Sequence, residues 1–341
     1  MRQRENYTAI FANTDNMERE SIRVVRYSAD LKDIWDNFVE ESRNGTFLHK
    51  RAYMEYHSDR FCDYSMLFYC GDRPIALLPA NITDETVVSH GGLTYGGLIM
   101  GNDATAERVL EIFDVLKEHL AKETNAKRLL YRPVPHIYHS YPCEEDLYAL
   151  FRNNALLIER KISTTIKLSR PLPFKGRRKM TAAAKSRLHI VEDNNLADFW
   201  RILEERLMGK YGVAPVHTLQ EIELLHNLFP QNILLLRVTD NSGTTLGGVV
   251  IYIVGRVAHT QYIGATDEGR RIGALDHLYE YLISDRFSGF EYFDFGVSTE
   301  QGGHYLNSGL IAHKERLGGR ATIYDTYAIE IKRVDNGKEE K

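Results

Sequence analysis

The stretch that decides the fold runs from Phe290 to Gly319 and reads FEYFDFGVSTEQGGHYLNSGLIAHKERLGG. Its first residues alternate with period two, so Phe293 and Phe295 face one side of a strand while Asp294 faces the other. The pattern predicts a buried strand that ends in a polar, glycine-rich loop. Asp294 therefore stands near the end of a core strand, facing that loop.

A short helix is expected after the loop. Leu306, Leu310 and Leu317 have helical spacing, and Gly318 follows where a left-handed C-cap would stand. This helix carries Lys314 close behind the glycine-rich loop.

The order of these elements resembles the C-terminal signature of the Fem-type peptidyltransferases, which are relatives within the GNAT acyltransferase superfamily. The residues that carry the resemblance are Tyr-Phe-Asp-Phe-Gly at 292–296, Gly309-Leu310, and Lys314-Glu315-x-Leu317-Gly318-Gly319. The family usually has aromatic residues where this chain has His313 and Leu317. The resemblance extends more weakly over residues 22 to 332. It implies a mixed α/β fold of two tandem GNAT-like modules, of the acyl-CoA N-acyltransferase type.

The composition is that of an ordinary globular protein with room for two domains: 341 residues, of which 43% are hydrophobic and 11% aromatic. A net charge of −4 argues against DNA as a partner, because a sequence-independent nucleic-acid footprint needs many cations on one face. Cys62, Cys70 and Cys143 show no Cys-x-x-Cys spacing, so neither a disulfide framework nor a metal site is predicted. No apolar run approaches the ~20 residues of a membrane span, and we expect a soluble, cytoplasmic protein.

The predicted elements occur in one order twice: hairpin strands, a long helix, a strand, a short helix and a strand. The helix after Ala106 corresponds in this order to the helix after Ala274. Such units, in which a helix joins hairpin strands to a parallel neighbour, are mixed α/β modules. Two prolines within residues 169–174 mark the junction. We therefore expect flexible ends at 1–20 and 335–341, modules at 21–168 and 169–334, and a basic helix at 175–187 beside the junction.

The resemblance implies an acceptor cleft to which the first module contributes the run from His90 to Leu98. Four glycines in this run indicate a backbone that bends sharply or meets a ligand closely. Tyr95, Gly96 and Gly97 are therefore candidates for substrate binding. In the second module, the strand that contains Tyr262 would offer backbone donors to the acyl donor, which makes Tyr262 a further candidate.

Arg270, Arg271 and Gly273 stand where acetyl-CoA enzymes of this superfamily hold the pyrophosphate. Arg270-x-x-Gly273 fits the first half of that motif, but Leu275 replaces its last small residue. Two arginines before a helix could bind phosphate through charge and free N–H groups, and a solvated turn is the alternative. The basic segment with Arg178 could bind acceptor phosphates or a tRNA arm, or it could be a solvated face.

Asp294, His304 and Lys314 are the catalytic candidates. Asp294 either accepts hydrogen bonds from the following loop, the interpretation we favour, or acts as a general base. His304 titrates nearest neutrality, so it is the expected proton acceptor if the protein supplies one. By the resemblance, Lys314 supports substrate binding and the negative charge of the reaction, and an ordinary exposed helix lysine is the alternative. The loop also offers polar side chains for substrate binding: Ser298, Glu300, Tyr305 and Asn307.

These features predict an N-acyltransferase that makes an amide on an amino sugar or a cell-envelope precursor. Acyl-CoA is the favoured donor and aminoacyl-tRNA the second, and a nucleotide-activated or lipid-linked acceptor is the expected partner. We expect a monomer or a weak dimer. The rival hypothesis is a non-catalytic module that binds sugar-phosphate or envelope precursors in a degenerate cleft.

Overall fold

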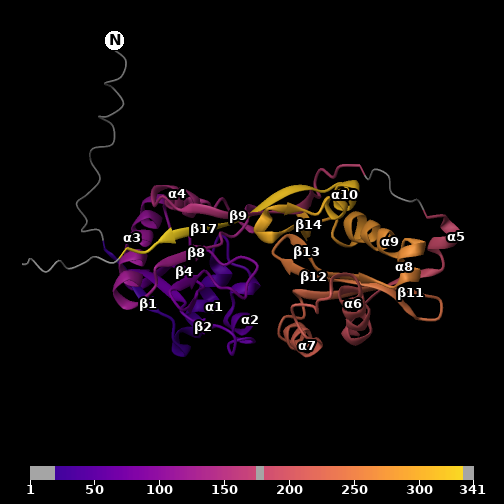
Figure 1. Ribbon diagram of the computed structural model, residues 1–341, viewed down its shortest axis with the longest axis horizontal. Coiled ribbons are helices and arrows are strands. Elements are labelled where there is room, and N and C mark those ends of the chain that lie inside the picture. Colours follow the sequence, from indigo (N-terminus) through magenta and orange to yellow (C-terminus); the bar gives the residue numbers. More distant parts are fainter. Residues whose placement is uncertain (1–19, 174–179, 333–341) are drawn as a thin grey trace, which may run out of the picture.

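A computed structural model describes residues 20–173 and 180–332 of the chain. Figure 1 shows two lobes side by side, the first half of the sequence in indigo and magenta and the second in orange and yellow. β9 (Leu156–Lys167) and β17 (Arg320–Glu330) run between the lobes. The two halves are thus joined by strands as well as by side-chain packing.

The described part of the first half contains four α-helices among short strands. The remaining elements of this half are β1 (Ile22–Arg26), α1 (Lys32–Glu41), α2 (Arg51–Glu55), β2 (Cys62–Asp63), β3 (Met66–Cys70), β4 (Arg73–Leu78), β5 (Asn81–Thr83), β6 (Thr86–Val88), β7 (Ile99–Met100), α3 (Ala106–Glu123), β8 (Arg128–Tyr131) and α4 (Glu145–Arg152).

The second half places helices on both faces of its strands. Its remaining elements are α5 (Ala182–Lys185), β10 (Leu188–Asp193), α6 (Leu196–Tyr211), α7 (Leu219–Leu228), β11 (Ile233–Asp240), β12 (Thr245–Val254), β13 (Val257–Ala265), α8 (Asp267–Ile272), α9 (Ala274–Tyr281), β14 (Tyr292–Val297), β15 (Thr299–Glu300), β16 (Tyr305–Leu306) and α10 (Ser308–Arg316).

The last strand of each half pairs with a strand of the other half. β9 pairs antiparallel with β14, where Ile166 lies opposite Phe293. β17 pairs antiparallel with β8, where Tyr327 lies opposite Tyr131. The result is an 11-stranded sheet of order β10-β11-β12-β13-β14-β9-β17-β8-β6-β5-β2, beside a 4-stranded sheet of order β1-β3-β4-β7. The division of the chain at residue 168 stays a prediction, because the shared sheet runs across both halves.

The parallel pair β13–β14 opens after a short contact. The two strands are in register only from Val257 opposite Tyr292 to His259 opposite Asp294. Beyond Asp294, β14 continues beside β9, and β13 carries an irregularity opposite Val250 and Ile251. One edge of β13 is therefore open from Thr260 onward, at the point where Asp294 and His259 stand side by side.

A continuous apolar core fixes the two lobes to each other. The ring of Phe47 in the first half lies 5.3 Å from that of Phe229 and 5.4 Å from that of Tyr252 in the second. All three side chains are buried, and burying one large apolar side chain stabilises the fold by about 1.5–3 kcal/mol. Around Phe47, the seam between the lobes is thus a packed interior.

Many expected elements are present, and one differs. Thr218 and Glu221 have the sequence spacing of a capping box, and both of its hydrogen bonds are present at the start of α7. Gly318 has the left-handed conformation expected of a C-cap, with φ of 98°. Of the basic helix expected at 175–187, residues 175–179 lie outside the described residues. Within 180–187, α5 has only four residues, and the chain then enters β10, which pairs with β11. Strand pairing takes precedence over helix propensity after Arg187, since Leu188 gains a buried place in the sheet.

Two further properties bear on function. No helix in the described residues is long and apolar enough to cross a membrane. Residues 20–173 and 180–332 also contain no group of three His, Cys, Asp or Glu side chains that could hold a metal ion.

Candidate active site

Asp294 is the centre of a buried hydrogen-bond cluster at the seam between the lobes. Its side chain has no exposed surface. The Tyr138 and Tyr324 hydroxyls each donate to Oδ2 over 2.9 Å, the Ser163 hydroxyl donates to Oδ1, and the Gly296 N–H donates to Oδ1 over 3.1 Å. Strand alternation explains this position, because it sends Phe293 and Phe295 into the opposite core beside α9.

The cluster keeps Asp294 ionised. Burial alone would raise its pKa, but hydrogen bonds from His259, Ser163 and Tyr324, together with the charge of His259, lower the pKa to about 2. A carboxylate that accepts several hydrogen bonds is stabilised in its charged form. Asp294 therefore supplies a fixed negative charge inside the seam.

His259 lies against this charge. Its Nδ1 is 2.8 Å from Oδ2 of Asp294, so Nδ1 carries a proton and donates. No described residue hydrogen-bonds its Nε2, and the His259 side chain is 14% exposed. In the neutral tautomer that donates through Nδ1–H, the lone pair of the imidazole is on Nε2. The pair is therefore suited to accept a proton from a group placed beside Nε2.

A narrow cavity of about 10 Å³ reaches His259 from the seam. It is lined by residues of both lobes: Leu48, Thr94, Tyr95, Tyr138, Tyr252, Val254, His259 and Gln261. This volume is about that of one water molecule. It has room for a water or the amino group of an acceptor beside His259, but not for a whole substrate.

Lys314 is buried and takes part in a backbone contact. Its Nζ donates to the carbonyl oxygens of Gly296 and Val297 over 2.8 and 2.9 Å. Only 7% of the residue is exposed, and burial lowers the pKa of Lys314 to about 8 although the charge of Asp294 opposes this shift. Lys314 thus links α10 to Gly296 and Val297, at the end of β14 shortly after Asp294.

The loop after β14 lies along β9 rather than in the cavity. His304, Tyr305 and Glu300 are exposed, and none of residues 298–307 lines the His259 cavity. Asn307 caps α10 by accepting from Leu310 N–H and donates to Glu300. Ser298 is buried, and its hydroxyl has no hydrogen-bond partner.

The backbone geometry at Gly96 and Gly97 of the first module requires glycine. A Cβ at Gly96 would stand 1.9 Å from the carbonyl oxygen of Ser89, and Gly97 has φ of 39° with Pro133 close by. Tyr95, by contrast, lines the cavity, and its ring lies 4.8 Å from that of Tyr138. Of these three predicted residues, only Tyr95 is brought beside His259.

Tyr262 lies in β13, in contact with His217. Its hydroxyl lies against Nδ1 of His217, and its ring packs on Trp200 at 4.9 Å. It does not line the His259 cavity. Arg178 lies outside the described residues.

Arg270 and Arg271 lie in the last turn of α8, the helix that follows β13, and Gly273 is its C-cap. Arg270 is paired with Asp267 and Arg271 with Glu268, and Gly273 ends α8 in the left-handed conformation. These residues fit an acyl-CoA pyrophosphate in charge, and both arginines are exposed enough to exchange partners. Surface ion pairs of this kind contribute only about 0–1 kcal/mol, so a pyrophosphate could replace the carboxylates.

The sequence did not single out His259, Tyr138 or Tyr324. Val257–Ala265 was expected as a strand, and it is β13 in the structure, but nothing in that strand marked His259 as the partner of a residue 35 positions away. Tyr138 and Tyr324, which are 186 positions apart, meet only because β17 crosses into the first half. The one available signal was the polar histidine within an otherwise apolar strand.

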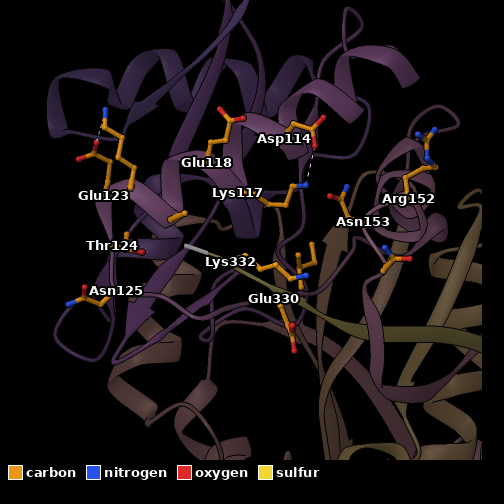
Figure 2. Close-up of a pocket in the computed structure, with 14 residues that line it drawn as sticks. Asp114, Lys117, Glu118, Glu123, Thr124, Asn125, Arg152, Asn153, Glu330 and Lys332 are labelled. Atoms are coloured by element: carbon orange, nitrogen blue, oxygen red, sulfur yellow. Dashed lines mark ion pairs between the residues drawn. The ribbon is translucent and has the colours of Figure 1, made fainter. Parts of the chain in front are cut away.

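A larger hollow lies far from this cluster, at the outer end of the first lobe. Figure 2 shows its wall, built from α3, the end of α4 and the end of β17. Its volume is about 1200 Å³. Acidic and basic side chains alternate around it, among them Lys117 paired with Asp114 and Lys122 with Glu123. It contains no residue of the Asp294 cluster.

Comparison with known proteins identifies the fold. Residues 175–305 match the family model described as an acetyltransferase (GNAT) domain. The solved structure of FemX is similar over 89% of this chain and 96% of that chain, at 12% identity and a TM-score of 0.61. No curated protein matches the sequence.

Two further solved structures have the same arrangement. A tandem GNAT protein from the clavulanic acid biosynthesis pathway is similar over 92% of this chain and 100% of that chain, at 12% identity and a TM-score of 0.53. L-PGS from Bacillus licheniformis is similar over 88% of this chain and 91% of that chain, at 14% identity and a TM-score of 0.55. The chain therefore has the tandem GNAT fold, which confirms the expected fold class and the likeness to Fem-type transferases. The domain match and these neighbours support an acyltransferase.

Proposed function

We propose that this protein transfers an acyl group to the amino group of an amino sugar or a cell-envelope precursor, and that His259 accepts the proton. The observation that carries the proposal is the 2.8 Å contact between His259 Nδ1 and Asp294 beside a cavity that reaches both lobes. FemX and L-PGS have the same fold. The resemblance of the C-terminal signature to Fem-type peptidyltransferases supports an envelope acceptor.

The proposed reaction is a direct displacement at the acyl carbon. The acceptor nitrogen forms a bond to the acyl carbon and gives a proton to His259 Nε2. As the bond from the acyl carbon to the leaving sulfur or oxygen breaks, the imidazolium returns that proton to the leaving atom. Asp294 stabilises the imidazolium that forms. The open edge of β13 beyond His259 offers backbone donors for the negative charge that develops on the acyl oxygen.

Acyl-CoA is the first donor to test, since GNAT domains use it. It would supply an activated thioester, and Arg270 and Arg271 would hold its pyrophosphate after leaving Asp267 and Glu268. An aminoacyl-tRNA is the second donor, with an ester in place of the thioester. Nucleotide-activated and lipid-linked amines are the proposed acceptors.

The decisive experiment combines binding and turnover. Calorimetric titration with acyl-CoA and with amino sugars should show binding of both, and mass spectrometry should detect the amide product. Loss of product with His259→Ala, with donor binding retained, is expected. A protein that binds acceptors but no acyl donor, and yields no amide with acyl-CoA or aminoacyl-tRNA, would instead be a non-catalytic binding module.

A further inference from the structure

A second cleft touches the Asp294 cluster without sharing a lining residue with the His259 cavity. Its volume is about 240 Å³, and its lining residues are His136, Ile137, Thr165, Lys167, Arg170, Leu172, Tyr292, Gly318, Arg320, Ala321 and Thr322. We refer to these eleven residues as the basic groove. The Thr165 hydroxyl lies 2.8 Å from that of Thr322 and 3.5 Å from Oδ1 of Asp294. The groove floor thus borders the cluster that holds His259.

The basic groove carries charge of one sign. Its lining includes His136, Lys167, Arg170 and Arg320 and no acidic residue. Among the described residues, neither Lys167 nor Arg170 has an acidic partner. Arg320 uses one guanidinium nitrogen for backbone carbonyls of Gly319 and Glu315, and its other nitrogens are open to a ligand. A cleft lined by one sign of charge concentrates ions of the opposite sign.

The volume and the remaining lining residues of the basic groove indicate which kind of ligand it can bind. The volume lies below the roughly 300–1,000 Å³ of sites that enclose a whole small molecule, so the groove suits one group of a larger substrate. Ile137, Leu172 and Tyr292 form an apolar side. Arginine and lysine together with threonine hydroxyls are the donors that bind phosphate oxygens well.

We propose that the basic groove binds a phosphate group of the acceptor substrate. Its role as an acceptor subsite rests on the proposed function, but phosphate binding itself does not. The two clefts meet at one cluster, since Tyr138 lines the cavity and Thr165 the groove and both contact Asp294. A phosphorylated amine that spans the seam would therefore be anchored by its phosphate while its amino group approaches His259.

The first test measures binding without turnover. Inorganic pyrophosphate is titrated calorimetrically into the wild type, the double variant Lys167→Glu/Arg170→Glu and the control Lys122→Glu. Lys122 is exposed and belongs to the hollow of Figure 2, so the control adds negative charge away from the groove.

We expect the double variant to bind about tenfold more weakly or worse, and the control to keep wild-type affinity. Equal affinity of the double variant and the control, which is the result expected if pyrophosphate binds only at Arg270 and Arg271, or no binding by the wild type, would overturn the proposal. Circular dichroism confirms folding, and all three substituted side chains are exposed.

The second test separates the groove from the chemistry. Glucosamine and glucosamine 1-phosphate are compared as acceptors. The double variant should raise KM for the phosphorylated amine alone, whereas His259→Ala should lower kcat with both. If neither amine is acylated by any donor, the proposed function fails while pyrophosphate binding still decides the groove. Unchanged KM values for both amines in the double variant would refute the subsite.

The source of the phosphate is found by competition against pyrophosphate. Uridine diphosphate represents a nucleotide-activated acceptor, and phosphatidylcholine vesicles with or without a polyprenyl phosphate represent a lipid-linked one. Competition by either probe supports the proposal and identifies the source. Competition by neither probe contradicts it.

Discussion

The Nδ1 atom of His259 lies 2.8 Å from Oδ2 of Asp294, although the two residues are 35 positions apart in the chain. They meet because β13 and β14 are parallel neighbours whose register ends with this pair. The same point is where β14 leaves β13 for β9. A histidine, the carboxylate that it contacts and an open strand edge therefore coincide at the seam between the lobes.

His259→Ala should lower kcat/KM for acyl transfer by on the order of 10²–10⁴, the usual contribution of a positioned general base. The fold should be retained, because His259 is partly exposed and packs at the edge of the cavity. Steady-state kinetics with the substrates of the wild type provide the measurement. His304→Ala is the matched control, since that histidine lies on the exposed loop. Wild-type turnover in His259→Ala would remove it from the mechanism.

Asp294→Asn should reduce both stability and turnover. An amide keeps the shape of the side chain but not the charge, and a hydrogen bond to a charged group contributes about 1.5–3 kcal/mol where a neutral one contributes about 0.5–1.5 kcal/mol. Urea denaturation gives the free energy of unfolding. Ser163→Ala removes one donor to the same carboxylate, so it should cost less than Asp294→Asn, which weakens several such bonds. Equal losses in the two variants would show that the charge of Asp294 is not what the cluster requires.

Lys314→Ala should lower both stability and activity. Truncation leaves the carbonyls of Gly296 and Val297 without their donor, and a buried unsatisfied polar group costs about 1–3 kcal/mol. If the ammonium also stabilises charge in the reaction, kcat/KM should fall on the order of a hundredfold. Thermal melts and kinetics are measured together.

Lys314→Arg and Lys314→Met separate the two effects. Arginine keeps the charge and methionine keeps the apolar stem. Partial activity with arginine and none with methionine would indicate an electrostatic role. Similar activity in the two variants would leave Lys314 as a support for the end of β14.

The fold could be predicted from local patterns because each element carried its own signal. Period two marked β14, the capping box marked the start of α7, and Gly318 marked the end of α10. The exchange of β9 and β17 between the halves carried no such signal, since it depends on pairing across the whole chain. The repeated order of elements would be the same whether β9 and β17 paired within their own halves or were exchanged between them.

The candidate site was predictable only in part. Asp294 was found because a carboxylate in an aromatic strand is conspicuous. The sequence favoured hydrogen bonds from the following loop, whereas the side-chain donors in the structure, such as Ser163 and Tyr324, come from other strands. The loop residues, His304 among them, were chosen for their polarity, whereas the structure places a partly buried histidine at the carboxylate. Polarity along the chain reveals which residues can reach solvent, but a site at a seam is formed by residues whose neighbours are distant in sequence.

Arg270→Ala should raise KM for acyl-CoA with little change in kcat, because pyrophosphate binding contributes equally before and during the reaction. Asp267→Asn should have the opposite effect, since it releases Arg270 from its intramolecular partner. The pair of variants is compared by titration with CoA. If both leave CoA affinity unchanged, the turn after β13 does not bind the donor.

Acidification should destabilise the protein between about pH 6.5 and 4, before the carboxylate of Asp294 is protonated. Burial lowers the pKa of His49, His57 and His217 to about 4 and that of His90 to about 3. These histidines are neutral in the folded protein, and each binds a proton in the unfolded chain once the pH falls below about 6.5. Their stabilising contribution is therefore complete above pH 6.5 and is lost as the pH falls toward 4.

His57→Leu tests this directly, because neither ring nitrogen of His57 has a hydrogen-bond partner among the described residues. The variant should keep the free energy of unfolding near its wild-type value at pH 7.5. Between pH 6 and 5 it should lose stability less steeply than the wild type, by up to about 1.4 kcal/mol per pH unit, the contribution of one proton. Urea denaturation across this range gives the slopes, and His304→Gln on the exposed loop should follow the wild-type curve. A His57→Leu curve parallel to the wild type would mean that His57 takes up its proton in the folded state as readily as in the unfolded chain.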